Sequence, residues 1–121
     1  MLSSNLLRAL KDDSDAQAKA SGEIVGLDFD PFLNTQDPCE HYEVGEIVQQ
    51  EQTYRAQILG VCSGKKNEKP DVIAQVERQS GHWVFVNFDY PGLERQYPSS
   101  ANLLATLKAL QEERKAIKAK P

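Results

Sequence analysis

The chain has 121 residues, the size of one ordinary domain, and its composition, 40% hydrophobic and 26% charged, is that of a globular protein. Its 18 acidic and 14 basic residues give a formal charge of −4. That balance disfavours a nucleic-acid-binding protein, which usually carries a strong basic excess. No apolar run approaches the roughly 20 residues that a membrane span needs, so we expect no membrane span.

Residues 1–22 are expected to be helical. Ser3 and Ser4 precede an apolar stripe that begins at Leu6, and serine at this place is typical of a helix N-cap. Polar residues interrupt the stripe, so it lacks the continuous apolar stretch of a signal peptide. Export would therefore require a leader before Met1.

Residues 23–98 are expected to form a loop followed by a four-stranded antiparallel meander. The loss of strict alternation around Gly45 predicts a β-bulge. In the last strand, simple alternation places Trp83 and Phe85 on one face and Phe88 on the other. The four predicted strands are residues 41–50, 52–63, 71–78 and 82–89.

Residues 99–118 are expected to form a C-terminal helix capped by Ser99 or Ser100, with Leu103 and Leu107 on its apolar stripe. Helices segregated from an antiparallel sheet indicate the α+β class. We therefore predict a single α+β domain that spans the whole chain, with a curved sheet between two helical segments.

Two motifs suggest a family. The first motif is the turn and strand at Gly81 and Trp83, followed by a leucine-rich helix. The second is the loop Asp28-Phe29-Asp30-Pro31-Phe32-Leu33 with Gln36-Asp37. Together they resemble an uncharacterised, often exported bacterial family. It belongs to the cystatin-like, nuclear-transport-factor-2-like superfamily. The resemblance implies a cystatin-like sheet with a cone between sheet and helix, and a homodimer. Those domains usually begin with a longer helix in the concave face of the sheet, a role that only the Leu6–Leu10 stripe could fill here.

Seven acidic residues and no lysine or arginine occupy residues 28–51. Charge without local partners must face water or a cation, so this segment is expected to contact a basic protein partner, mainly raising the association rate. The expected contact residues are Asp28, Asp30, Asp37, Glu40, Glu43 and Glu46. The aspartates in this set could instead accept hydrogen bonds in turns. The last eleven residues carry four basic and two acidic side chains and are expected to be a solvated end.

Cys39 and Cys62 are expected to form a disulfide if the protein is periplasmic or extracellular, and to be buried thiols if it is cytoplasmic. With His41 and His82 they have the residue types of a zinc site, but their spacing does not match one. The loop that carries Asp28 and Asp30 also lacks the spacing of a calcium-binding loop. We expect no metal site and no cofactor.

An aromatic groove is the other candidate site, formed by Tyr54, Trp83, Phe85 and Tyr90, although aromatic residues at strand spacing more often form a core. No catalytic residue is expected, because alternation places His82 and Asp89 on opposite faces of the last strand and no nucleophile or phosphate-loop motif is present. A pair of His41 with Asp28 or Asp30 stays open, on proximity in the sequence alone. The sequence thus favours a non-enzymatic binding domain of the inhibitor or immunity type. The alternative is a small-molecule-binding or hydrolase/isomerase-like domain that uses the cone.

Overall fold

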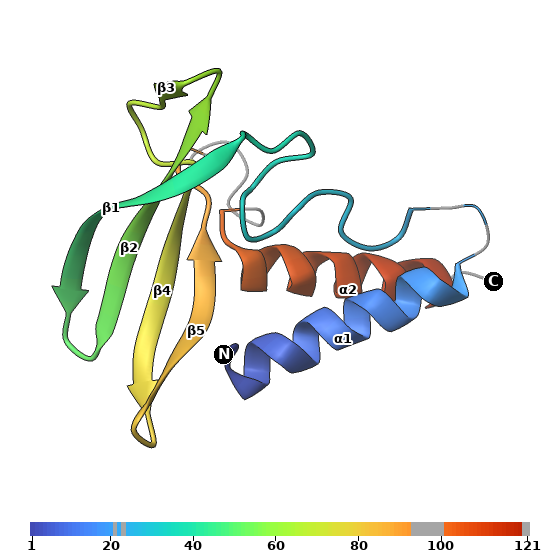
Figure 1. The fold of residues 1–121 in the computed structure, drawn as a ribbon. Helices are drawn as coiled ribbons and strands as arrows, with labels where there is room; N and C mark the ends of the chain where they lie inside the picture. Colours follow the sequence, from blue (N-terminus) through green and yellow to red (C-terminus); the bar gives the residue numbers. More distant parts are fainter. Residues whose placement is uncertain (21, 23, 93–100, 120–121) are drawn as a thin grey trace.

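The computed structural model of the protein describes residues 1–20, 22, 24–92 and 101–119 (Figure 1). The elements, in chain order, are α1 (Ser4–Lys19), β1 (His41–Gln50), β2 (Thr53–Cys62), β3 (Lys65–Lys66), β4 (Val72–Gln79), β5 (His82–Asp89) and α2 (Leu103–Ala119). The strands form one antiparallel sheet in the order β1-β2-β4-β5, with β3 paired to β2. The α+β class is therefore confirmed.

The sheet has five strands, so the expected number of four is wrong. The additional strand, β3, folds back onto the end of β2 after a tight turn at Ser63 and Gly64. Both turn residues have positive φ, 52° and 74°, which is the backbone conformation of a two-residue hairpin turn. The polar composition of this segment concealed the short pairing.

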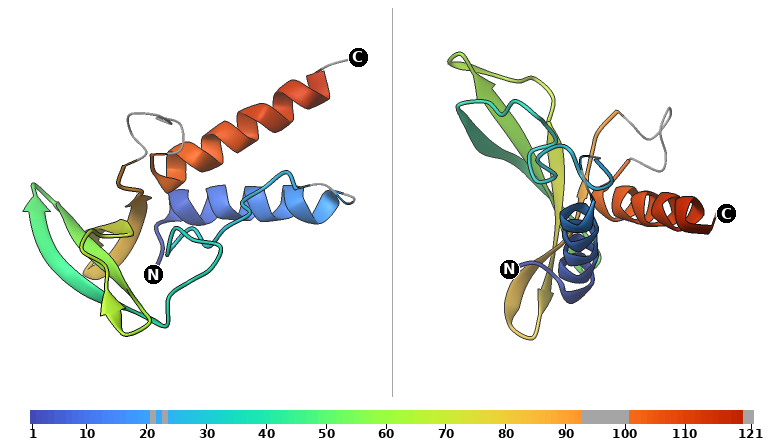
Figure 2. Two further views of the ribbon diagram at one scale, coloured as in Figure 1. Left: turned by 90° about the horizontal axis from the view of Figure 1, so that it is seen from above. Right: turned by 90° about the vertical axis from the view of Figure 1, so that its right-hand side faces the viewer.

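The two helices lie next to each other and extend away from the β5 side of the sheet (Figures 1 and 2). Within the described residues, both contact β5 and neither runs across β1 or β2. The chain also covers the outer edge of β5. Leu2 bridges Phe85, whose N–H donates to the Met1 carbonyl (2.8 Å), and Asp89 bridges Asn102. The opposite edge, β1, has no such cover in the part of the chain that the structure describes.

The helix starts follow from side-chain capping. The Leu6 N–H donates to Ser3 Oγ (3.2 Å), which confirms the expected cap of α1. At α2, the Ala105 N–H donates to Asn102 Oδ1 (2.8 Å). The expected caps Ser99 and Ser100 lie outside the described residues.

The core lies where the two helices meet β4 and β5. Leu6 and Leu103 are completely buried, and Tyr90 is 1% exposed. The cluster consists of Leu6, Val72, Ala74, Phe88, Tyr90, Leu103 and Leu107. The core thus occupies one side of the sheet at the β4–β5 end.

Two irregularities set which side chains share a face of the sheet. The predicted bulge in β1 is confirmed by a shift of register between Val44 and Ile47. A Cβ on Gly45 would lie 2.5 Å from Leu59 Cδ1, so a larger residue would have to displace Leu59 from its place.

A second shift, in the β4–β5 ladder, pairs Gln75 with Asn87 but Val76 with Phe85. The extra residue in β5 returns Phe88 to the same face as Phe85, and the two rings stack at 5.5 Å. The prediction that these residues lie on opposite faces is therefore wrong, because it assumed an unbroken alternation.

An ion pair joins the two helices at the end remote from the sheet. Asp13, buried in α1, accepts hydrogen bonds from Arg114 Nη1 of α2 (3.3 Å) and from the Leu27 N–H (2.9 Å). Arg114 also donates to the Val25 carbonyl (3.0 Å). Its side chain is only 14% exposed, so at this position the tail is not the solvated end that we expected.

No helix among the described residues combines the length and the apolar character required to cross a membrane.

Candidate functional site

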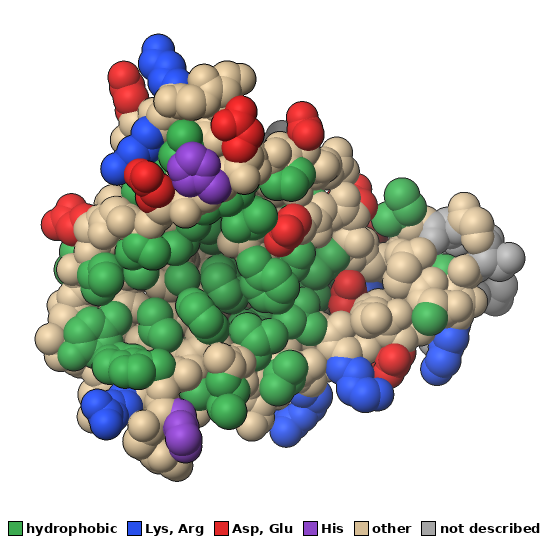
Figure 3. All heavy atoms as spheres, in the orientation of Figure 1, with side chains coloured by type: hydrophobic (Ala, Val, Ile, Leu, Met, Phe, Trp, Pro, Cys, Tyr) green, Lys and Arg blue, Asp and Glu red, His purple; other side chains and the backbone are tan. Residues whose placement is uncertain are grey.

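Apolar side chains continue along one face of the sheet from the helix-covered core at β4 and β5 toward β1. Ile58 and Phe85 pack against that core, whereas the outer members of the face are exposed. Cross-strand pairing aligns Tyr54 with Val76 and Val76 with Phe85, so all three project from the same face. We call this set the open face; its members are Val44, Ile47, Tyr54, Ala56, Ile58, Val76, Trp83 and Phe85. In Figure 3 hydrophobic side chains form one continuous area over the sheet.

The open face is exposed to a degree that is unusual for large apolar side chains. Val44 is 61% exposed, Ile47 59% and Trp83 50%. Single exposed apolar residues are common, but contiguous ones mark interaction surfaces in soluble proteins. The sheet hydrogen bonds fix the spacing of these side chains, so the surface is already formed before anything binds to it.

Ring contacts hold the aromatic end of the open face in place. Trp83 contacts Tyr54 edge to face at 5.2 Å between ring centroids. The guanidinium of Arg78 lies 5.8 Å from the centre of the Trp83 ring, within the range of a cation–π interaction. Of the four expected groove residues, Tyr54, Trp83 and Phe85 come together here, whereas Tyr90 lies in the core.

The six acidic residues expected as one contact surface fall into two groups. The first group lies in the loop before β1, and the second lies on β1. On that strand Glu43 pairs with Leu59, on the face opposite to the one that Val44 shares with Ile58. The loop group is Asp28, Asp30, Asp37 and Glu40; the strand group is Glu43 and Glu46.

Three of these carboxylates have local partners. Asp30 Oδ1 accepts the N–H of Phe32 (2.9 Å), as expected for a turn aspartate. Glu40 accepts the Ser63 N–H (2.9 Å), and Glu43 pairs with Lys66 at 3.4 Å. Asp37 makes no ion pair with any described residue, and it is exposed.

The loop of residues 28–40, which we call the acidic loop, borders the open face. Phe32 contacts Phe88 edge to face at 5.2 Å, and Phe88 in turn stacks on Phe85. A disulfide between Cys39 and Cys62 joins the loop to the end of β2, with 4.7 Å between the Cα atoms. The loop is therefore held beside the face at Phe32 and at Cys39.

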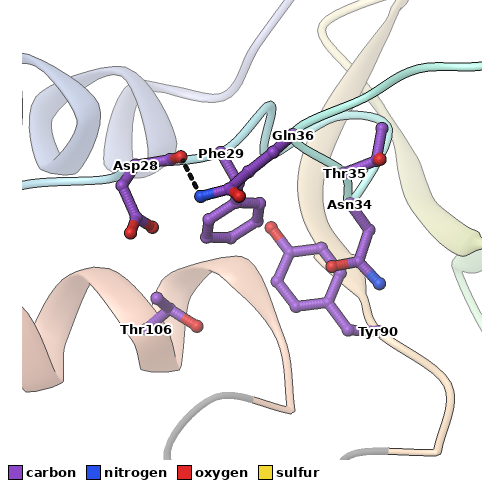
Figure 4. Close-up of a pocket in the computed structure, with 7 residues that line it drawn as sticks. All are labelled: Asp28, Phe29, Asn34, Thr35, Gln36, Tyr90 and Thr106. Atoms are coloured by element: carbon purple, nitrogen blue, oxygen red, sulfur yellow. Dashed lines mark hydrogen bonds between the residues drawn. The ribbon is translucent and has the colours of Figure 1, made fainter.

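A pocket of about 340 Å³ lies between this loop and the first turns of α2 (Figure 4). Asp28, Phe29, Gln36 and Thr106 are among its lining residues, together with Tyr90. The Tyr90 hydroxyl donates to the Pro31 carbonyl (2.8 Å). Burial, and secondarily the nearby Asp30 carboxylate, raise the pKa of Tyr90 far above its ordinary value, so this hydroxyl is neutral at physiological pH.

The opposite face of the sheet carries an ion-paired polar cluster beside the buried residues Leu59, Val61 and Val84. Arg55 Nη2 lies 2.7 Å from Asp89 Oδ2, and the Gln75 amide donates to Asp89 Oδ1 (2.8 Å). Because of the β5 bulge, His82 and Asp89 share this face, and the expectation that they oppose each other is wrong. They remain apart, since their partners Gln79 and Ile73 are six positions apart on β4, or about 20 Å.

The geometry therefore shows neither a catalytic pair nor a metal site on these residues. The described residues contain no group of three His, Cys, Asp or Glu side chains close enough to hold a metal ion. His41 and His82 are both exposed, and Cys39 and Cys62 are bonded to each other.

Val44 and Ile47, the most exposed members of the open face, were not predicted as site residues from the sequence. Their spacing of three residues hides the shared face, because strict alternation places them on opposite sides. The bulge predicted at Gly45 contained the missing signal, since one extra residue between them restores a common face.

A comparison with known proteins finds no family model that matches the chain, no similar curated protein and no similar solved structure. The geometry of the open face and of the pocket therefore carries the functional argument.

Proposed function

We propose that the protein is a non-enzymatic binding domain that uses the open face to bind a basic protein partner. The observation that carries this proposal is the exposure of Val44, Ile47 and Trp83 on a face that is mainly apolar, although it also carries Gln49 and Arg78. Burying such a surface is favourable by about 25 cal/mol per Å² of apolar area.

An amphipathic helix of the partner fits this surface best. Ala56 is a small residue paired across the strands with Ile47 and Ala74, so no bulky side chain projects from the middle of the face at that position. Apolar residues of a helix at three- and four-residue spacing are typical ligands of such faces.

The charge of the bordering loop selects a basic partner. Residues 28–40 carry four acidic and no basic side chains, and Asp37 and Glu40 are exposed. Complementary charge at the edge of an apolar interface mainly raises the association rate and suppresses wrong partners. An inhibitor or immunity-type protein of the periplasm or extracellular space is one concrete form of this function, and the Cys39–Cys62 disulfide supports that location.

The order helix, antiparallel sheet, helix and the turn at Gly81 before Trp83 support the resemblance to the cystatin-like superfamily as part of the same proposal. The alternative, a small-molecule or hydrolase/isomerase-like site in the cone between helix and sheet, has less support. Leu6, Tyr90 and Leu103 fill the space where the helices meet the sheet, and each is at most 1% exposed.

The single tryptophan gives a direct test, because Trp83 lies on the open face. We would titrate the protein with a tryptophan-free amphipathic helical peptide of leucine and lysine, and with its leucine–glutamate counterpart. The lysine peptide should give a saturable blue shift of the Trp83 emission, and the glutamate peptide should bind much more weakly.

The matched variants are Ile47→Asp and Val48→Asp. The two residues are neighbours on β1, but Ile47 pairs with Ala56 and Val48 with Arg55, so they lie on opposite faces. Ile47→Asp should weaken peptide binding by at least about tenfold, and Val48→Asp should leave it unchanged. Equal effects of the two variants, or a dimer of this protein that only Ile47→Asp dissociates, would show that the open face does not serve a basic partner.

A further inference from the structure

The pocket between the acidic loop and α2 lies outside the open face and shares no residue with it. Figure 4 shows the Asp28 carboxylate directed toward α2, on which Thr106 lies, with the rings of Phe29 and Tyr90 beside them. Phe29 and Tyr90 contact each other edge to face, 5.7 Å between centroids. The pocket thus combines one carboxylate with an aromatic wall.

The hydrogen-bond donors of the lining are largely committed to the main chain. The Gln36 amide donates to the Asp28 carbonyl (2.9 Å), and the Thr106 hydroxyl donates to the Asn102 carbonyl (2.8 Å). The Asn34 amide donates to the Asp71 carbonyl (3.1 Å).

Tyr90 follows the same rule through its bond to Pro31, and Thr35 Oγ1 accepts from the Asp37 N–H (3.0 Å). Gln36 and Asn34 each keep a second N–H, and Thr35 keeps its hydroxyl proton. The one charged group among the described lining residues, however, is the Asp28 carboxylate, and the side-chain carbonyls of Gln36 and Asn34 are further acceptors.

The Asp28 carboxylate has no cationic neighbour among the described residues. It is exposed and makes no ion pair there. An acceptor-rich pocket with an unpaired negative charge favours a ligand that brings several donors and a positive charge.

We propose that this pocket binds an alkylammonium or guanidinium group. Asp28 forms the ion pair, the Gln36 carbonyl accepts a second hydrogen bond, and the Phe29 ring contacts the alkyl chain and the cation. The group comes either from a lysine or arginine side chain of a partner or from a free amine. A divalent metal fits less well, because Asp28 is the only carboxylate in the lining that the structure describes and hard cations take six or more oxygen ligands.

The test is a titration of the isotope-labelled protein with butylammonium, followed by the amide signals of Gln36 and Thr106. Butanol serves as the uncharged control. Saturable shifts with butylammonium and none with butanol are expected. A blocked peptide with one lysine distinguishes the two sources: if it binds at least as well, the ligand is a partner's side chain, and if only the free amine binds, the ligand is a small amine.

Asp28→Asn should lower the association constant for butylammonium by up to about fivefold, whereas Asp37→Asn, a loop carboxylate outside the pocket, should leave it unchanged. Equal shifts with butanol, an unchanged affinity in Asp28→Asn, or a stronger response to Ca²⁺ would each overturn the proposal. The Ile47→Asp variant should bind butylammonium normally, so a failure of the open-face proposal is distinguishable from a failure here.

Discussion

Replacing Asp13 by alanine should destabilise the protein more than any other loss of a surface or near-surface charge. The Asp13 carboxylate links three segments: its own helix α1, the main chain at Leu27, and Arg114 of α2. It is 8% exposed on its side chain, so water cannot replace the lost partners. Gly26 lies directly against it, since a Cβ there would be 2.8 Å from Asp13 Oδ2.

The size of the effect follows from what remains after the substitution. Removing one partner of a buried ion pair costs about 3–5 kcal/mol when the other charge is left unpaired. Arg114 is not left unpaired, because it keeps the Val25 carbonyl (3.0 Å) and Asp12 (3.0 Å). Hydrogen bonds to charged groups contribute about 1.5–3 kcal/mol, so we expect a loss of about 3 kcal/mol.

Urea unfolding followed by far-UV circular dichroism measures this loss. The matched control is Asp12→Ala, because Asp12 pairs with the same arginine but is 52% exposed, and exposed pairs contribute about 0–1 kcal/mol. Asp13→Asn retains an acceptor for the Leu27 N–H and should fall between the two. If Asp13→Ala costs no more than Asp12→Ala, the ion pair does not fasten the helices together and the reasoning is wrong.

Three further predictions concern the loop and its surroundings. Folding favours the neutral form of Tyr90, whose pKa burial and Asp30 raise, so its contribution to stability is present below the ordinary tyrosine pKa of about 10 and is lost as the pH rises above it. Alkaline unfolding curves of Tyr90→Phe should show a smaller loss. Reducing the Cys39–Cys62 disulfide, whose residues are 23 apart in sequence, should cost about 3 kcal/mol, measured by urea unfolding with and without reductant; an unchanged midpoint would contradict this. Gly60→Ala should lower the melting temperature, because its Cβ would lie 2.8 Å from Cys39 Sγ, and an unchanged value would show that the loop yields.

The sequence predicted those features of the fold that depend on local patterns. The cap at Ser3, the strands from His41 to Gln50 and from His82 to Asp89, and the bulge near Gly45 all follow from residues close together in the chain. A cap needs only a serine before an apolar stripe, and a strand needs only alternation.

Features that depend on pairing between distant residues were not predicted. Nothing in β5 alone marks the extra residue between Phe85 and Phe88, because it arises from the register with β4. Likewise, Arg114 reads as part of a basic tail, and only the packing of α2 against α1 brings it to Asp13. The open face was predicted only in part, through Tyr54, Trp83 and Phe85. The position of the helices decides which part of a sheet face stays exposed, and that position cannot be read from the strands alone.

The two edges of the sheet differ in a way that limits how copies of this chain could join. Leu2 and Asn102 form β-bridges with Phe85 and Asp89 on the outer edge of β5. A strand of another molecule could pair along that edge only by displacing them. Among the described strands, β1 is the one long strand with an unpaired edge, since β3 has only two residues, and an unpaired edge is where strand addition occurs. Two molecules joined through β1 would consume both free edges and present covered β5 edges at each end. Growth by strand pairing would stop there, at a closed pair and not an open fibre.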